Sequence, residues 1–188
     1  MKIVELVINE EAEMFGMDAV SLVEFPAIES DFVALSSQKV EFKTIDKDKR
    51  IVMGPALIPN KPIVRLDDDG KEYFVFFSNS TVRRGAELFF KGGNQGRVNI
   101  EHDKEVESIY FFESWIVEGE QDKSRMYGLE APIGSWLLTA KIENDEVWND
   151  YIKTGRVKAF SIEGYFLDKM QIQMSVLDEL EVLLCKSL

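Results

Sequence analysis

The sequence predicts a single α+β domain built mainly from antiparallel strands. About seven short stretches rich in β-branched and aromatic residues follow one another from residue 51 onward, separated by turn-forming residues. A few other stretches have the apolar spacing of helices, but strands and helices do not alternate regularly, as they would around a parallel sheet. A chain of 188 residues that is 45% hydrophobic can bury one ordinary core.

A cluster of charged residues suggests a boundary near the start of this domain. Residues 43–50 are rich in lysine and aspartate, so we divide the chain into an N-terminal segment, residues 1–48, and a main domain, residues 49–188. The N-terminal segment is a candidate for removal or for tethering another protein.

The first elements of the main domain are predicted from their prolines and glycines. Residues 51–59 contain two prolines, which confine that strand to a sheet edge or a bend. Residues 63–66 and 73–77 form a hairpin, because Asp69-Gly70 between them readily adopts the positive φ angles of a tight turn.

A helix is predicted next, over residues 81–91. Ser80 can cap it, and Gly92-Gly93 ends it. A second helix begins after Asn144 and ends at Gly155. The other predicted elements are strands at residues 97–103, 109–117, 135–142 and 158–166, and an amphipathic helix from residue 175.

Composition excludes several classes of function. Thirty-four acidic and 22 basic residues leave a net charge of −12, which repels nucleic acid and anionic membranes. With one cysteine, Cys185, and one histidine, neither an internal disulfide nor a Cys/His zinc site is expected, so we predict no metal and no cofactor. The chain lacks a signal-peptide pattern and any run of about 20 apolar residues, so we expect a soluble protein made in the cytoplasm.

One histidine and one serine are the candidate chemical groups. His102 is the only histidine, and imidazole is the base that activates a serine hydroxyl near neutral pH. Alternation along residues 97–103 places His102 on the apolar face of that strand, and alternation along residues 158–166 places Ser161 opposite the core. A lone histidine on an apolar face is also typical of an ordinary core, so spacing alone leaves both interpretations open.

Five blocks of the sequence, in this order, resemble the XkdF-type phage serine proteases. These are relatives of the prohead, or capsid-maturation, proteases of tailed bacteriophages. The resemblance implies a fold similar to the herpesvirus assemblins, which is a small, mainly antiparallel β-barrel surrounded by helices. The blocks are residues 54–62, 99–102, 113–117, 134–136 and 158–166.

The resemblance also implies residue roles for a serine endopeptidase in residues 49–188. Ser161 is the nucleophile and His102 is the general base. Asp168 lies in the region expected for the third catalytic residue. Glu163 is the rival, because it shares a face with Ser161 at about 6.6 Å along the strand.

Other residues are weaker candidates for supporting roles. Glu113 is a less favoured candidate for the catalytic acid. Because no arginine follows Arg156, the donors to the oxyanion would be backbone amides, an ordered water, or an arginine such as Arg83 or Arg84. Ser114 and Ser135 are rival hydroxyls, which we interpret as sheet or turn residues.

The resemblance further implies partners and a location. The substrates would be the phage scaffold and the major capsid protein, inside the immature head in the host cytoplasm, and neither nucleic acid nor a membrane is an expected partner. The C-terminal helix could serve a homodimer. The alternative is a non-catalytic head-assembly or scaffold-binding protein with the same fold.

Overall fold

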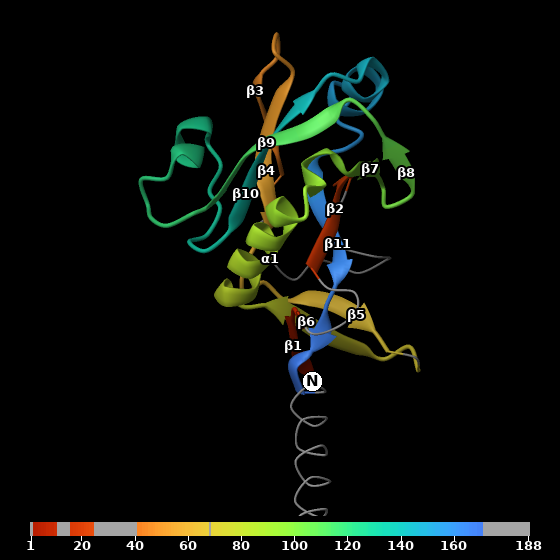
Figure 1. Ribbon diagram of the computed structural model, residues 1–188, viewed down its shortest axis with the longest axis vertical. Coiled ribbons are helices and arrows are strands. Elements are labelled where there is room, and N and C mark those ends of the chain that lie inside the picture. Colours follow the sequence, from red (N-terminus) through yellow and green to blue (C-terminus); the bar gives the residue numbers. More distant parts are fainter. Residues whose placement is uncertain (1, 11–15, 25–40, 68, 171–188) are drawn as a thin grey trace, which may run out of the picture.

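The computed structural model describes residues 2–10, 16–24, 41–67 and 69–170, and these form three four-stranded sheets (Figure 1). The first sheet has the order β12-β1-β6-β5, formed by Leu167–Asp168, Ile3–Val7, Glu72–Phe77 and Ile63–Leu66. The second has the order β3-β4-β10-β9, formed by Lys43–Asp46, Ile51–Leu57, Trp136–Ile142 and Ile109–Ile116. The third has the order β11-β2-β7-β8, formed by Ala159–Tyr165, Gly16–Val23, Val98–Ile100 and Lys104–Val106.

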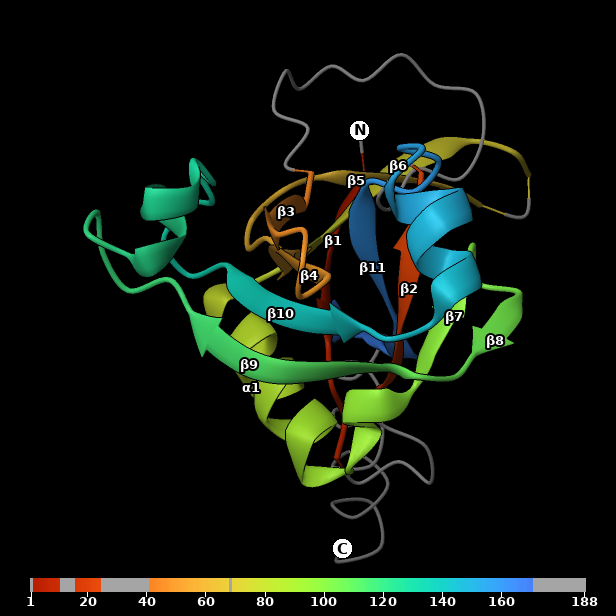
Figure 2. The ribbon, with the colours of Figure 1, turned by 90° about the horizontal axis from the view of Figure 1, so that it is seen from above.

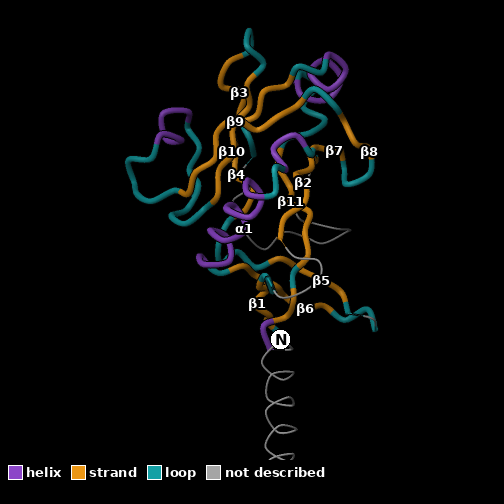
Figure 3. Tube along the Cα trace, in the orientation of Figure 1, coloured by secondary structure: helices purple, strands orange, loops and turns teal. Residues whose placement is uncertain are grey.

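Helices are few within the described ranges. The α-helix α1 covers Asn79–Lys91 and packs against β2, β9 and β10. Three short segments complete the helical structure, namely the 3₁₀ turns η1 (Asn94–Gly96) and η2 (Lys123–Tyr127) and the π-helical η3 (Val147–Ile152). Strands make up most of the regular structure (Figure 3). Among the described residues, no helix is long and apolar enough to span a bilayer.

The predicted α+β fold, an assemblin-like barrel surrounded by helices, is wrong, because the described residues form mostly β-sheet. The described strands form three separate open sheets, and α1, the one complete α-helix among the described residues, cannot surround them. A barrel needs a closed hydrogen-bonded ladder. Strands β4 and β11 lie next to each other, but in the described part of the chain no ladder joins them. Pro55 in β4 has no backbone N–H to donate, which limits the ladders that this strand can form.

Most of the individual elements agree with the predictions. The hairpin is confirmed, because β5 pairs with β6 antiparallel and Gly70 has φ +74°. The cap before η3 is also confirmed, because the Val147 N–H donates to Asn144 Oδ1 at 3.0 Å. The predicted Ser80 cap of α1 is wrong, since the helix begins at Asn79 with Ser78 as its N-cap. The helix expected from residue 175 lies outside the described residues.

The N-terminal residues supply strands to all three sheets. Strand β1 lies between β12 and β6, β2 lies between β11 and β7, and β3 is an edge strand beside β4. The pairings of β1 with β6 and of β2 with β7 are parallel. Removing residues 1–48 would therefore withdraw the strand that joins β11 to β7. The removal of this segment in the cell, or its use as a tether, remains a prediction.

An aromatic cluster fixes the sheet that carries Ser161 against the neighbouring sheet. Phe160 in β11 is 1% exposed, and its ring centroid lies 5.4 Å from that of Phe111 in β9 with the planes at 86°. Phe89 of α1 in turn contacts Phe111 and Trp136. Figure 2 shows the antiparallel strands β9 and β10 side by side near α1, with β11 and β2 close to them. Because Phe160 faces this core, the next side chain, Ser161, faces away from it.

We predict that Phe160→Ala lowers the free energy of unfolding by about 3–5 kcal/mol, because it leaves a cavity between the two sheets. The matched control is Phe112→Ala, since Phe112 is 48% exposed on β9. That control should change stability by less than about 0.5 kcal/mol. Urea denaturation measures both values, and equal losses in the two variants would contradict the assignment of Phe160 to the core.

Candidate active site

A row of polar side chains crosses the third sheet. Ser161 on β11 is paired with Ser21 on β2, and Ser21 is paired with Asn99 on β7. Residues that face one another across neighbouring strands project on the same side of a sheet. All three are buried, with exposed fractions of 7%, 0% and 6% respectively. The strand register therefore brings together three polar groups that are far apart in the sequence.

His102 lies in a turn and not in a strand. Strand β7 ends at Ile100, and Glu101 and His102 both have left-handed backbones, with φ of 52° and 60°. The Asp103 N–H donates to the Ile100 carbonyl at 3.1 Å, which closes a tight turn between β7 and β8. The predicted placement of His102 on the apolar face of a strand is wrong. Ile100 is in the core, whereas the side chain of His102 is 41% exposed.

Three hydrogen bonds hold this strained turn. A left-handed backbone costs a residue other than glycine roughly 1–2 kcal/mol, so the surroundings must enforce it. The Glu101 N–H donates to the Leu22 carbonyl at 3.1 Å, and the Glu24 N–H donates to Glu101 Oε1 at 2.7 Å. The His102 N–H donates to Asn99 Oδ1 at 3.1 Å. The turn is therefore attached to both β2 and β7.

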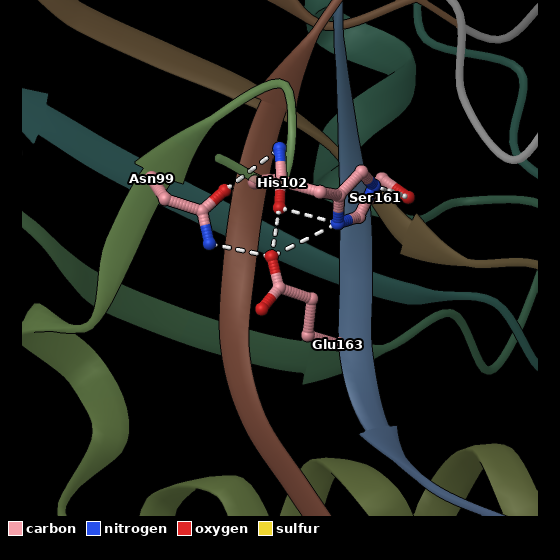
Figure 4. A network of polar contacts seen from close by, with 5 residues as sticks. Asn99, His102, Ser161 and Glu163 are labelled. Carbon is pink, nitrogen blue, oxygen red and sulfur yellow. Dashed lines mark hydrogen bonds and ion pairs between the residues drawn. The ribbon is translucent and has the colours of Figure 1, made fainter. Parts of the chain in front are cut away.

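The turn directs the His102 ring between a hydroxyl and a carboxylate (Figure 4). His102 Nε2 lies 3.0 Å from Ser161 Oγ, and Nδ1 lies 2.9 Å from Glu163 Oε1. A carboxylate can only accept, so Nδ1 carries the proton and Nε2 accepts from the serine hydroxyl. This is the tautomer that a general base for Ser161 requires.

Ser21 and Asn99 complete the network around Glu163, and sequence analysis missed both. Ser21 Oγ donates to Glu163 Oε1 at 2.7 Å and lies 2.9 Å from His102 Nδ1. Asn99 Nδ2 donates to the same carboxylate oxygen. Asn99 lies within one of the blocks that carry the family resemblance, but nothing in the local pattern of Ser21 distinguishes it from any other serine in a strand.

The network keeps Glu163 ionised. Partial burial raises the pKa of this carboxyl, but the hydrogen bonds from Ser21, Asn99 and His102 lower it more, so the pKa lies below its usual value. Near neutral pH, Glu163 is therefore a carboxylate that can accept from Nδ1 and stabilise a protonated ring.

Asp168 lies away from this network. It belongs to β12 in the first sheet, where it is paired with Leu6, and its Oδ1 accepts from the Met170 N–H at 2.8 Å. Within the described residues, no hydrogen bond or ion pair joins Asp168 to His102. The structure therefore brings Ser161 and His102 together with Glu163, the rival acid, and not with Asp168.

The other candidate residues also have partners elsewhere. Glu113 accepts from Thr139 Oγ1 and pairs with Lys123. Arg83 pairs with Glu118, and Arg84 pairs with Glu10 and Glu87. Ser114 accepts from Trp136 Nε1. Among the described residues, neither arginine forms a hydrogen bond or ion pair with the His102 network, so this structure does not support either as an oxyanion donor.

The geometry suits nucleophilic catalysis on an acyl group. Ser161 Oγ can pass its proton to Nε2, and the ring is held from its far side by an ionised carboxylate. The side chain of His102 is 41% exposed, whereas Ser161 is 7% exposed. Among the described residues, no group of His, Cys, Asp and Glu side chains is arranged to hold a metal ion.

A comparison with protein families finds a match to a model described as "Putative phage serine protease XkdF", over residues 39–168. The matched region contains Asn99, His102, Ser161 and Glu163, whereas Ser21 precedes it. No curated protein and no solved structure matches the chain significantly.

We predict that Glu163→Gln slows labelling of Ser161 by a fluorophosphonate about a thousandfold, because an amide cannot stabilise the protonated ring as a carboxylate does. Asp168→Asn is the matched control and should label at the rate of the unmodified protein. A larger loss in Asp168→Asn than in Glu163→Gln would return the role of the acid to Asp168.

Proposed function

The chain belongs to the family of phage serine proteases named for XkdF, and on that basis we propose that it is a serine endopeptidase with Ser161 as its nucleophile. The observation that carries the proposal is the continuous chain of contacts from Ser161 Oγ to His102 Nε2 at 3.0 Å and from His102 Nδ1 to Glu163 Oε1 at 2.9 Å. These three side chains come from β11 and from the turn after β7.

In the proposed reaction, Ser161 Oγ attacks the carbonyl carbon of a peptide bond while His102 Nε2 takes the hydroxyl proton. The resulting imidazolium is stabilised by Glu163 through Nδ1–H. The ring then gives its proton to the leaving amine, which leaves an acyl group on Ser161. A water molecule, deprotonated by the same Nε2, attacks this ester and releases the acid and the free serine.

We propose that the substrates are segments of the phage scaffold and the major capsid protein, cleaved inside the immature head in the host cytoplasm. The family name supports a phage setting. The net charge of −12 supports a place in the head before packaging, because such a protein has little affinity for the incoming DNA.

We predict that a fluorophosphonate labels the unmodified protein and that Ser161→Ala and His102→Ala each abolish labelling. Loss of the hydroxyl removes the nucleophile, and loss of the imidazole leaves it unactivated. Mass spectrometry of the intact protein measures the adduct. Ser114→Ala removes a hydroxyl on β9 that accepts from Trp136 Nε1 and has no contact with His102, and this variant should label normally.

A well-folded protein that takes up no label, in heads as well as in isolation, would overturn the enzyme assignment. It would favour the alternative of a non-catalytic assembly or scaffold-binding protein.

A second prediction concerns the substrates. When the protein is produced together with the scaffold and the major capsid protein of its phage, heads assembled with the unmodified chain should contain shortened forms of one or both proteins. Heads assembled with Ser161→Ala should contain only full-length forms, as judged by mass spectrometry of purified particles. Full-length proteins in both types of head would contradict the proposed substrates and leave the chemistry of Ser161 to the labelling experiment.

A further inference from the structure

Asn99 contacts both the backbone that carries the proposed base and the proposed acid. Its Oδ1 accepts from the His102 N–H at 3.1 Å, and its Nδ2 donates to Glu163 Oε1. The side chain is 6% exposed and lies next to Ser21 across the strand pair. One rigid amide therefore spans the distance between the turn and β11.

The orientation of this amide follows from its partners. A backbone N–H needs an acceptor and a carboxylate needs a donor, so only one of the two flipped orientations satisfies both. The reverse orientation would place the amide oxygen against the Glu163 carboxylate and the NH₂ group against the His102 N–H. Both contacts would be repulsive in a partly buried site.

The contact to His102 matters because the turn is strained. His102 has φ of 60°, and it is followed directly by Asp103, whose N–H closes the turn. A strained backbone persists only where its surroundings enforce it. Asn99 enforces it at the residue whose ring must reach Ser161.

We propose that Asn99 is a positioning residue, which fixes the His102 turn and the Glu163 carboxylate relative to each other so that one tautomer of the ring faces Ser161. The proposal rests on the proposed function for its catalytic meaning. Its structural content, the state of the His102 ring, can be measured without any activity.

The same amide also contributes to the charge of Glu163. Burial raises the pKa of Glu163, and the donors Ser21, Asn99 and His102 together lower it below its usual value. Among the described residues, His102 is the only titratable group in hydrogen-bond contact with this carboxylate. Removing the Asn99 donor should therefore raise the Glu163 pKa, and the carboxylate would be protonated at a higher pH.

Asn99→Asp separates the two contacts of this amide. Aspartate has the same shape and keeps an acceptor for the His102 N–H, but it replaces the donor to Glu163 with a second carboxylate. We predict that the acid limb of the pH profile of Ser161 labelling, where the rate falls on acidification, moves to higher pH by about one unit. The labelling rate should be restored as the pH rises. Asn149→Asp adds the same charge at an exposed position on η3 and should leave the limb in place.

The second measurement uses the fact that the chain has one histidine. Protein labelled with ¹⁵N-histidine gives one imidazole signal set, whose nitrogen shifts identify the protonated nitrogen. The unmodified protein should show only the Nδ1–H form of the neutral ring. Asn99→Leu, which removes both contacts, should show a mixture of the two forms.

The outcomes separate this proposal from the proposed function. A single Nδ1–H form in folded Asn99→Leu, or an unshifted acid limb in Asn99→Asp, would overturn the role of Asn99 while leaving Ser161 as the nucleophile. Absence of labelling in the unmodified protein would overturn the protease assignment, and the ring signals would still decide the role of Asn99. If Asn99→Leu does not fold, Asn99→Ala, which also removes both contacts, takes its place in the ring measurement.

Discussion

The pairing of β2 with β11 on one side and β7 on the other is the constraint on which the candidate site depends. This register aligns Ser161, Ser21 and Asn99 in one row. It also brings the turn after β7 close enough for the His102 ring to reach across β2 to Ser161 and Glu163. A shift of one residue would turn every side chain of β2 to the opposite face. Ser21 would then enter the core, and the Leu22 carbonyl that anchors the turn would change its direction.

The local strain and the local charge of the site are balanced by the same groups. Two consecutive left-handed residues are unfavourable, and a partly buried carboxylate is unfavourable as well. Asn99 relieves both problems, since its oxygen accepts from the strained backbone and its nitrogen donates to Glu163. Ser21 adds a second donor to the same carboxylate oxygen. Many of the ion pairs of this acidic chain lie on the exposed surface, such as that of Arg83 with Glu118, and such pairs contribute little to stability.

Sequence patterns predicted elements better than they predicted architecture. The hairpin of β5 and β6 and the Asn144 cap follow from residues close in the chain, and both were correct. The barrel was wrong because closure depends on whether β4 and β11 form a ladder, and no local pattern records that. The prediction from the alternation of side chains along a strand was wrong at His102 for a related reason. It assumes that a strand continues, whereas β7 ends at Ile100 and the chain turns.

The sequence by itself determined which groups were available for chemistry. With one histidine in the chain, His102 had to be the base of any serine mechanism that uses imidazole, and the blocks around it and around Ser161 indicated the family. Only the tertiary structure decided which acid accompanies them. Along the chain, Asp168 was the predicted acid and Glu163 its rival, and both lie close to Ser161 in sequence. Hydrogen bonding acts through a few ångströms of space, and in space Glu163 reaches Nδ1 while Asp168 pairs with β1 in another sheet.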